Sequence, residues 1–388
     1  MKKFEIIAKT LFGFEELLAG ELRQIGAEDI EILNRAVKYS GDKSILYLSN
    51  LYLRTALKIL KPIGYFDVAN ENDLYNKVKE ISWENHLSAD QSLAIDGFTN
   101  SKFFNHSQYV ALKTKDAIAD YFREKYGKRP SVDLEYPDLR INVHITDMRC
   151  TLSLDSSGPS LGKRGYKKNQ TEAPLSEVLA AGIIMLTLWD KETAFYDPMC
   201  GSGTFAVEAA LIAGNIAPGL FRNFAFQKWK DYEPELWKSI LEEAKAKVQK
   251  IKSPIIASDS NPRAVSIARA NAAIAGVDKH ISFDTVNFHK SLRPFDNGIM
   301  VMNPPYGKRL EDEEKMTAFY KMTGDYLKNQ YQGWDAWIFS GNPEALKHFG
   351  LRASKKSKLF NGQIECSLQK FELYQGSKKA KKNQLGYE

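Results

Sequence analysis

Hydrophobic and polar positions in the first 160 residues follow each other in short runs that predict a mixed α and β fold. Residues 2–10 alternate as a strand, and residues 12–26 place their leucines on one helical face before Gly26, where the helix is expected to stop. A strand-rich segment is predicted next, at residues 31–41 and 44–53. It is expected to lead into a helix that ends before residue 66.

A second β–α pattern follows in the same part of the chain. A strand is expected at residues 92–101, then a helix at 109–127 that ends at Gly127. Two alternating strands at 139–147 and 149–158 are predicted to pair. This order of strands and helices predicts one or two small α+β units with antiparallel strand pairing.

From about residue 170 the pattern changes to strands that alternate with helices. The expected strands are short apolar runs, as in a parallel sheet covered on both faces, at residues 194–198, 254–259, 280–286, 298–303 and 335–340. Helices are expected at residues 204–214, 262–276 and 314–330. Asn361–Gly362, between two extended runs, predicts a final antiparallel hairpin. The sequence therefore predicts an α/β fold with a doubly wound, Rossmann-like parallel sheet. An insertion at residues 215–252 lengthens the first crossover, and its role stays open.

Composition narrows the class of protein. A chain of 388 residues, 43% hydrophobic and 26% charged, is expected to form two or three globular domains rather than a disordered chain. Its three cysteines lie far apart, which argues against a disulfide scaffold or zinc site and favours a reducing cytoplasm. The six histidines have no metal-ligand spacing, so no metal is expected. The N-terminus does not have the pattern of a signal peptide, and no apolar run is long enough for a membrane span.

Charge adds a local hint of nucleic-acid binding. The formal net charge of +6 is too small, over this length, to indicate a nucleic-acid partner by itself. One short segment is basic and carries an aromatic residue: Lys163, Arg164, Tyr166, Lys167 and Lys168. Such a segment can follow a phosphate backbone while the ring stacks on a base, and we predict these five residues as RNA-binding. The alternative is a solvated linker.

The first chemical motif follows the strand that ends at Asp197. Gly201 and Gly203 allow a sharp turn and a close approach of the backbone to a ligand, and a helix is expected to begin near Thr204. Amides at a helix start favour a negatively charged ligand group. A GxG pair is also found in ordinary tight turns, and no Gly-Lys-Ser/Thr completes a phosphate-binding loop.

The second motif is Asp259, at the end of the next expected strand. A carboxylate at this place can accept hydrogen bonds from both hydroxyls of a ribose. Asp259 could instead serve the start of the following helix, where Pro262 stands at the first turn. Both roles are compatible if Ser260 or Asn261 is the helix cap.

The third motif, Asn303-Pro304-Pro305-Tyr306, follows an apolar strand directly. The prolines cannot continue a central strand, so the chain must leave the sheet in a rigid shape. That shape is expected to present the Asn303 side-chain oxygen and the Pro304 carbonyl as two acceptors beside the ring of Tyr306. Two acceptors and a stacking ring match the exocyclic amine of a flipped-out base.

The chain resembles known enzymes at these motifs. DPMCGSGT at 197–204 and NPPYG at 303–307 are similar to the cofactor and catalytic motifs of class I S-adenosylmethionine-dependent amino-methyltransferases. Residues 140–186 resemble RNA methyltransferases that carry a THUMP domain, and among these the bacterial 23S rRNA guanine-N2 methyltransferases. The resemblance covers nearly the whole chain. It implies a ferredoxin-like region at 1–60, a THUMP RNA-binding domain at 61–162, a methyltransferase domain at 163–376 and a basic tail at 377–388.

The resemblance also implies roles for single residues. The cofactor-binding residues would be Asp197, Pro198, Gly201, Gly203, Thr204, Asp259, Ser260, Asn287 and Phe288. The catalytic residues would be Asn303, Pro304, Pro305 and Tyr306. An aspartate often binds the adenine amine in such enzymes, and here Asn287 and Phe288 stand in its place.

The function implied is transfer of a methyl group from S-adenosylmethionine to the N2 amine of a guanine in 23S rRNA, with RNA as the partner. Three alternatives stay open. They are a tRNA guanine-N2 methyltransferase, a DNA adenine-N6 methyltransferase, and a non-catalytic RNA-binding assembly factor with this fold.

Overall fold

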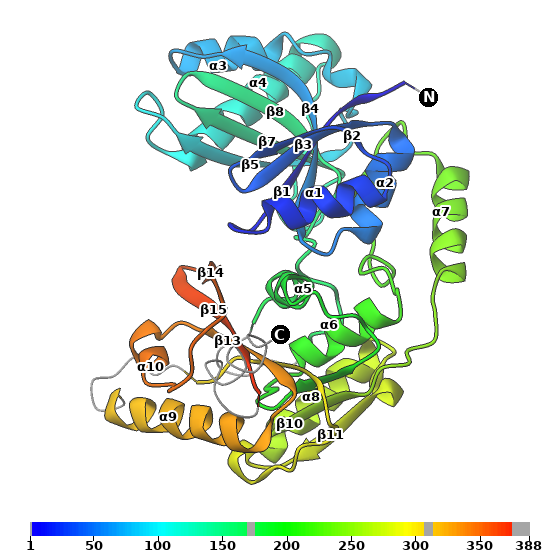
Figure 1. The fold of residues 1–388 in the computed structure, drawn as a ribbon. Helices are drawn as coiled ribbons and strands as arrows, with labels where there is room; N and C mark the ends of the chain where they lie inside the picture. The colour runs from blue at the N-terminus through cyan, green and yellow to red at the C-terminus, as the bar shows by residue number, and fades with distance from the viewer. Residues whose placement is uncertain (1, 169–174, 306–312, 375–388) are drawn as a thin grey trace, which may run out of the picture. The chain divides into compact units, whose positions relative to one another are not determined.

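The computed structural model describes residues 2–168, 175–305 and 313–374. The chain forms two compact units (Figure 1). The N-terminal unit holds residues 1–10, 18–161 and 222–244, and the C-terminal unit holds residues 11–17, 162–221 and 245–388. The predicted boundary between residues 60 and 61 falls inside the first of these units, and the four predicted domain ranges stay predictions.

The N-terminal unit is built on one eight-stranded sheet, in the order β2-β3-β1-β4-β8-β7-β5-β6. Its strands are β1 (Phe4–Thr10), β2 (Glu28–Leu33), β3 (Ala36–Gly41), β4 (Ala56–Asp67), β5 (Ser92–Asn100), β6 (Ser131–Val132), β7 (Leu139–Thr146) and β8 (Arg149–Asp155). The helices in this stretch of the chain are α1 (Glu15–Gln24), α2 (Lys43–Tyr52), α3 (Glu71–Lys79) and α4 (Ser107–Tyr126), with the short η1 (Trp83–Asn85). The predicted α+β class is confirmed. The pairing is not wholly antiparallel, because β5 runs parallel to both β7 and β6.

The sequence prediction was wrong for two adjacent elements. The segment 44–53 was expected to be strand-rich, but its residues 44–52 belong to helix α2. The helix expected before residue 66 is the long strand β4. Asp42 caps α2 by accepting a hydrogen bond from the Ile45 amide at 3.2 Å. Pro62 and Gly64 disfavour a helix in the following segment, where β4 has a bulge. Short apolar runs do not distinguish a buried helix from a strand, which explains the exchange.

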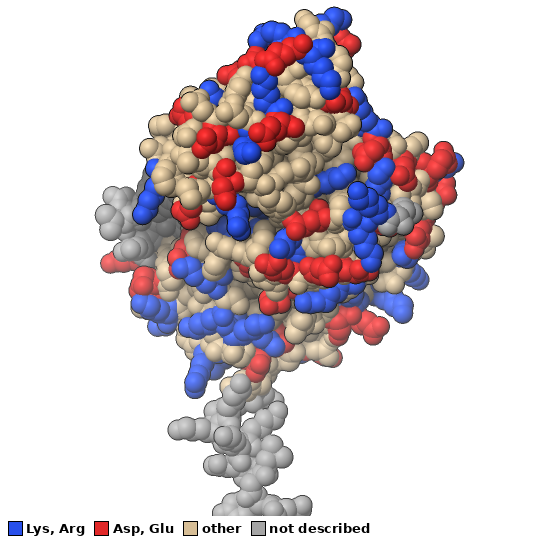
Figure 2. Space-filling view, turned by 90° about the horizontal axis from the view of Figure 1, so that it is seen from above, with Lys and Arg blue, Asp and Glu red and all other residues tan. Residues whose placement is uncertain are grey.

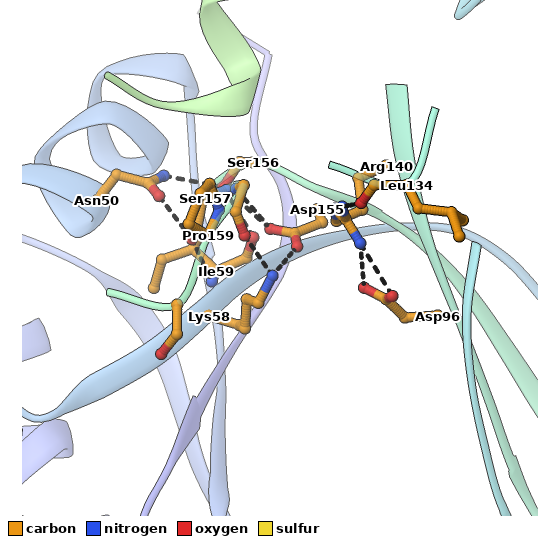
Figure 3. A network of polar contacts seen from close by, with 12 residues as sticks. Asn50, Lys58, Ile59, Asp96, Leu134, Arg140, Asp155, Ser156, Ser157 and Pro159 are labelled. Carbon is orange, nitrogen blue, oxygen red and sulfur yellow. Dashed lines mark hydrogen bonds and ion pairs between the residues drawn. The ribbon is translucent and has the colours of Figure 1, made fainter. Parts of the chain in front are cut away.

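A buried polar network ties β8 to β4 and α2 in the N-terminal unit (Figure 3). The Asp155 carboxylate, 1% exposed, accepts hydrogen bonds from Lys58 Nζ and from the Ser157 amide. Asn50 donates to the Ser156 hydroxyl at 2.8 Å and accepts from the Ser157 hydroxyl at 2.8 Å. Because each buried polar group has a partner, the network stabilises the junction of the first 60 residues with the strands that follow.

The insertion at residues 215–252 provides a further part of the N-terminal unit, since residues 222–244 belong to it. Phe226, from the short η2 (Ala225–Lys228), is fully buried and stacks on Tyr47 with ring centroids 4.3 Å apart. Helix α7 (Pro234–Ala246) adds Trp237, whose ring meets both of these rings edge-on. The aromatic residues of the insertion thus extend a hydrophobic core.

The C-terminal unit contains a seven-stranded sheet in the order β11-β10-β9-β12-β13-β15-β14. Its strands are β9 (Ala194–Asp197), β10 (Ile255–Asp259), β11 (Ile281–Thr285), β12 (Gly298–Met302), β13 (Trp334–Ser340), β14 (Lys355–Asn361) and β15 (Ile364–Glu372). The first five are parallel, and β15 is antiparallel to β13 and β14. The predicted doubly wound sheet with a terminal hairpin at Asn361–Gly362 is confirmed.

Helices connect these strands: α5 (Glu177–Leu186), α6 (Thr204–Ala213), α8 (Pro262–Ile274), α9 (Glu313–Gln330) and α10 (Pro343–Lys347), with the short η3 (Asp278–His280) and η4 (Phe288–Lys290). Strand β9 is buried at all four positions. The order of the strands reverses at β9, with β10 on one side and β12 on the other, and ligands of such sheets bind at this switch point. In the described parts of the chain, no helix combines the length and apolar character that a membrane span needs.

Candidate active site

The turn after β9 is shaped by two glycines in the left-handed region. Gly201 has a φ of 51° and Gly203 a φ of 78°. The Cys200 amide donates to the Ser258 carbonyl at 2.9 Å, which fixes the turn to β10. A side chain at Gly203 would place its Cβ 2.8 Å from that of Ala268 in α8. Gly203 is therefore required for packing, and it is not among the residues that line the cavity described below.

Asp259 at the end of β10 holds two loops at once. Its Oδ2 accepts from the Gly201 amide at 3.0 Å, and its Oδ1 accepts from the Asn261 amide at 2.9 Å. Asn261 is the cap of α8, as one of the two sequence readings expected. Each carboxylate oxygen can accept a second hydrogen bond, so Asp259 can still receive two hydroxyls from a ligand.

The loop after β11 contains the pair predicted to face the adenine edge. Asn287 caps the short η4 and accepts from the His289 amide at 2.9 Å. Phe288 is 3% exposed, and its ring packs edge-on against Tyr326. His289 comes next, and its ring hydrogen-bonds to Thr323 of α9.

The segment after β12 presents an unused acceptor. Asn303 is partly buried, and its Oδ1 has no hydrogen-bond partner among the described residues. A buried oxygen without a partner is costly, and it marks a place where a ligand donor would be favoured. Pro304 is buried and Pro305 exposed. Tyr306, the predicted stacking ring, lies outside the described residues.

A cavity of about 530 Å³ lies at this edge of the sheet. It brings together ten of the predicted cofactor-binding and catalytic residues: Pro198, Gly201, Thr204, Asp259, Ser260, Asn287, Phe288, Asn303, Pro304 and Pro305. The remaining wall consists of Leu175, Met199, Cys200, Ser202, Phe205, His289 and Phe319.

Asp197 lies behind the cavity wall instead of lining it, which corrects its predicted position. It is 1% exposed, and neither carboxylate oxygen has a hydrogen-bond partner of normal geometry among the described residues. Burial and the charge of Asp259 raise the pKa of Asp197 well above its ordinary value, and the Met199 amide offsets only part of this.

Cys200 in the turn is not a poised nucleophile. Its side chain is 6% exposed, and burial, together with Asp197 and Asp259, raises the pKa of its thiol. The reactive thiolate is therefore disfavoured. No cluster of metal-ligating side chains occurs within the described ranges.

The basic segment at residues 163–168 differs from the sequence prediction. Arg164 is 2% exposed and Tyr166 is 1% exposed. The Tyr166 hydroxyl donates to Glu208 Oε1 at 2.9 Å, and Arg164 Nε lies 3.6 Å from the same oxygen. Neither residue presents a surface to RNA, so the RNA-binding prediction is corrected for both, because a buried carboxylate on α6 attracts them inward.

The lysines of this segment divide into two kinds. Lys167 is partly buried and donates to the carbonyl of Leu175, a residue of the cavity wall. Lys163 and Lys168 are exposed, and their predicted contact with RNA stays a prediction.

Two lining residues outside the predicted motifs, His289 and Phe319, were not found by sequence reasoning. Phe319 belongs to a segment that carries no local motif. His289 was set aside because none of the histidines shows metal or catalytic spacing. Its place directly after Asn287 and Phe288 was the available signal.

The C-terminal unit has the fold of class I methyltransferases, with a ligand cavity at the switch point of the sheet and the Asn-Pro-Pro segment in its wall. Residues 164–370 match the family model described as "RMKL-like, methyltransferase domain". Residues 68–155 match a THUMP domain, and residues 5–60 match an RlmL ferredoxin-like domain. The chain belongs to this family of methyltransferases.

Relatives and solved structures agree with this assignment. A Synechocystis sp. protein provisionally named RNA methyltransferase slr0064 is 41% identical over 93% of this chain and 95% of its own length. Ribosomal RNA large subunit methyltransferase K/L of Syntrophotalea carbinolica is 40% identical over 93% of this chain, which spans only 52% of that protein.

Two solved structures cover almost the whole chain. The structure of SMU.472, described as a methyltransferase in complex with SAH, has a TM-score of 0.87 at 31% identity and covers 97% of this chain and all of its own. A structure from Listeria monocytogenes, described as an N6-adenine-specific DNA methylase, has a TM-score of 0.85 at 31% identity and covers 96% of this chain and 97% of its own.

Proposed function

We propose that this chain transfers a methyl group from S-adenosylmethionine to the exocyclic N2 amine of a guanine in large-subunit rRNA. The observation that carries the proposal is the buried Asn303 Oδ1, an acceptor without a described partner in the wall of the cavity. An exocyclic amine is a donor of the right kind to satisfy it.

The residues around the cavity fit S-adenosylmethionine, which supplies an electrophilic methyl group on a sulfonium. Asp259 has acceptor capacity left for two ribose hydroxyls. Asp197 is buried behind the cavity wall, so no direct contact with the cofactor is assigned to it. The backbone at Gly201, with a φ of 51°, has no side chain that would keep a ligand away. The complex of SMU.472 with SAH supports the same assignment.

The chemistry that we assign to Asn303 is electrostatic. The lone pair of an aryl amine is delocalised into the ring, so the amine is a poor nucleophile. A hydrogen bond from the amine to Asn303 Oδ1 localises the lone pair on nitrogen and stabilises the positive charge that develops there. Pro304 and Pro305 hold the acceptor in place, since their φ angles are fixed. Tyr306 would stack on the base.

RNA is the substrate class that we favour. The THUMP match and the names of the relatives support RNA, and the name K/L supports the large ribosomal subunit. The Listeria structure carries a DNA methylase name, which keeps the DNA alternative within the test. On the face seen in Figure 2, Lys and Arg side chains lie among Asp and Glu without a continuous patch of one sign. We also propose a cytoplasmic location, where ribosomal precursors are found.

The test is methyl transfer by the purified chain from labelled S-adenosylmethionine to 23S rRNA, to tRNA and to duplex DNA, followed by nucleoside analysis. The proposal expects N2-methylguanosine in the 23S rRNA sample. Label in N6-methyladenine of DNA, or in tRNA alone, would overturn the substrate assignment.

The Asn303→Ala variant tests the catalytic assignment. It should lower the rate about 10²–10³-fold, because one stabilising group is lost. Binding of S-adenosylhomocysteine should be unchanged. Asn342→Ala, which removes an asparagine that caps α10 and does not line the cavity, is the matched control. An equal loss of rate in both variants would contradict the role of Asn303.

A further inference from the structure

The imidazole of His289 is held in one orientation at the cavity wall. Its Nε2 lies 3.1 Å from the Thr323 hydroxyl on α9. Two rings of α9 also meet it edge-on, Phe319 at 5.4 Å and Tyr326 at 5.7 Å between ring centroids. A side chain with three such neighbours does not rotate freely, so the direction of its second nitrogen is set by the fold.

The hydrogen-bond network favours one tautomer of His289. The Thr323 hydroxyl has a single proton, and it donates this proton to the Phe319 carbonyl at 2.7 Å. Thr323 can therefore only accept from the histidine, which requires the proton on Nε2. Nδ1 is then the unprotonated nitrogen with a free lone pair. Burial lowers the pKa of His289, so the ring stays neutral at neutral pH.

Nδ1 is an acceptor that the described structure leaves open. It has no hydrogen-bond partner in the described part of the chain. It is also absent from the fully buried polar atoms of the described residues that lack a partner, so the atom is not fully buried. His289 is one of the residues that line the cavity. The neighbouring Asn287, which the sequence suggested for an adenine amine, accepts from the His289 amide at 2.9 Å and keeps one lone pair on its Oδ1, so the two residues can share the two protons of one amine.

We infer that His289 Nδ1 accepts a hydrogen bond from the exocyclic amine of the cofactor's adenine and thereby selects a 6-amino purine. The inference rests on the proposed function, because it concerns the cofactor of that reaction. Asp259 and Ser260, both predicted to bind the cofactor, line the same cavity as His289. An oxygen in place of the amine would set two lone pairs against each other, which is unfavourable in a partly dehydrated site.

The test compares binding of two ligands to the purified full chain by calorimetry. S-adenosylhomocysteine carries the 6-amine, and S-inosylhomocysteine carries an oxygen instead. His289→Phe keeps a ring and removes the acceptor. Its preference for the adenosine ligand should fall about 10- to 100-fold relative to the unmodified chain, the range expected for one hydrogen bond in a buried site. Other contacts to the purine are the same in all variants, so the change in the ratio reports on His289.

Thr323→Val provides a readout that a purely structural role would not give. Valine has nearly the shape of threonine but does not hold the proton on Nε2. The ring can then place a proton on Nδ1 and donate to the 6-oxygen, so S-inosylhomocysteine should bind more tightly to this variant than to the unmodified chain. A steric effect would weaken both ligands alike. His280→Phe, the same exchange at an exposed histidine that does not line the cavity, should leave both affinities unchanged.

The outcomes separate the two claims. If the unmodified chain binds neither ligand, the proposed function fails. If it binds S-adenosylhomocysteine and His289→Phe has an unchanged preference, the role of His289 is refuted and the proposed function is not.

Discussion

The buried charge pair between Arg164 and Glu208 gives a prediction whose size follows from burial. Glu208 is fully buried on α6, Arg164 is 2% exposed, and Nε of the arginine lies 3.6 Å from Oε1 of the glutamate. Removing one charge of such a pair leaves the other buried without its counter-charge, which typically costs about 3–5 kcal/mol. Glu208→Gln is the cleanest change, because the amide oxygen can still accept from the Tyr166 hydroxyl.

We expect Glu208→Gln to lower the free energy of unfolding of the C-terminal unit by about 3–5 kcal/mol. Glu177 lies near enough for Arg164 and Glu208 to influence its pKa, so it can take over part of the attraction and move the loss toward the lower value. Tyr166→Phe removes one hydrogen bond to a charged acceptor and should cost only about 1.5–3 kcal/mol. In the double variant Arg164→Met/Glu208→Gln both charges are gone, so much of the lost stability should return.

Hydrogen exchange read by mass spectrometry is the suitable assay, because a chain of two units does not unfold as one two-state system. Amides of α6 report on the C-terminal unit, and amides of β7 report on the N-terminal unit as an internal control. The reasoning is refuted if Glu208→Gln is as stable as Tyr166→Phe. It is equally refuted if the double variant is no more stable than Glu208→Gln alone.

Three further predictions concern the turn and the exposed lysines. Gly203→Ala should destabilise the chain by about 1–3 kcal/mol, because a φ of 78° is strained for alanine and the new Cβ would lie 2.8 Å from that of Ala268. The expected result is a lower thermal midpoint both with and without S-adenosylhomocysteine. The double variant Lys163→Ala/Lys168→Ala should reduce the slope of log affinity against log salt for RNA binding by up to about 0.7–0.9 per lost phosphate contact. Filter retention at several salt concentrations measures this slope, and an unchanged slope would exclude a role in phosphate binding. Cys200 should react with iodoacetamide far more slowly at pH 8 than in urea, because its raised pKa disfavours the thiolate, and rapid labelling of the folded chain would contradict its burial.

The sequence predicted the C-terminal fold and most of the cavity because the chemistry there is local. Asp259 ends β10, Asn303 follows β12 directly and Gly201 lies in the short turn after β9, and the carboxyl ends of parallel strands meet at one edge of a sheet. Periodicity was a weaker guide in the N-terminal part. The apolar pattern of the segments that form α2 and β4 is compatible with either a helix or a strand. Only the cap at Asp42 and the residues Pro62 and Gly64 distinguish the two.

Contacts between distant parts of the chain explain what the sequence did not predict. Arg164 and Tyr166 looked like a solvent-facing basic segment because their partner, Glu208, lies more than 40 residues away and only folding brings it near. His289 became informative only through Thr323, 34 residues further along the chain. Neither partner follows from spacing or composition, since both depend on how α6 and α9 pack.

The burial of Arg164 and Tyr166 changes how RNA affinity is expected to depend on salt. With these two residues committed to α6, the segment retains Lys163 and Lys168 as its exposed cations. Each phosphate contact contributes about 0.7–0.9 to the slope of log affinity against log salt, so this segment can contribute at most about 1.4–1.8. Lys and Arg are interspersed with Asp and Glu on the face seen in Figure 2, and the net charge of the chain is only +6. Phosphate contacts from this segment alone should therefore give only a shallow salt dependence, and selection of RNA is expected to need contacts to its shape and unpaired bases as well.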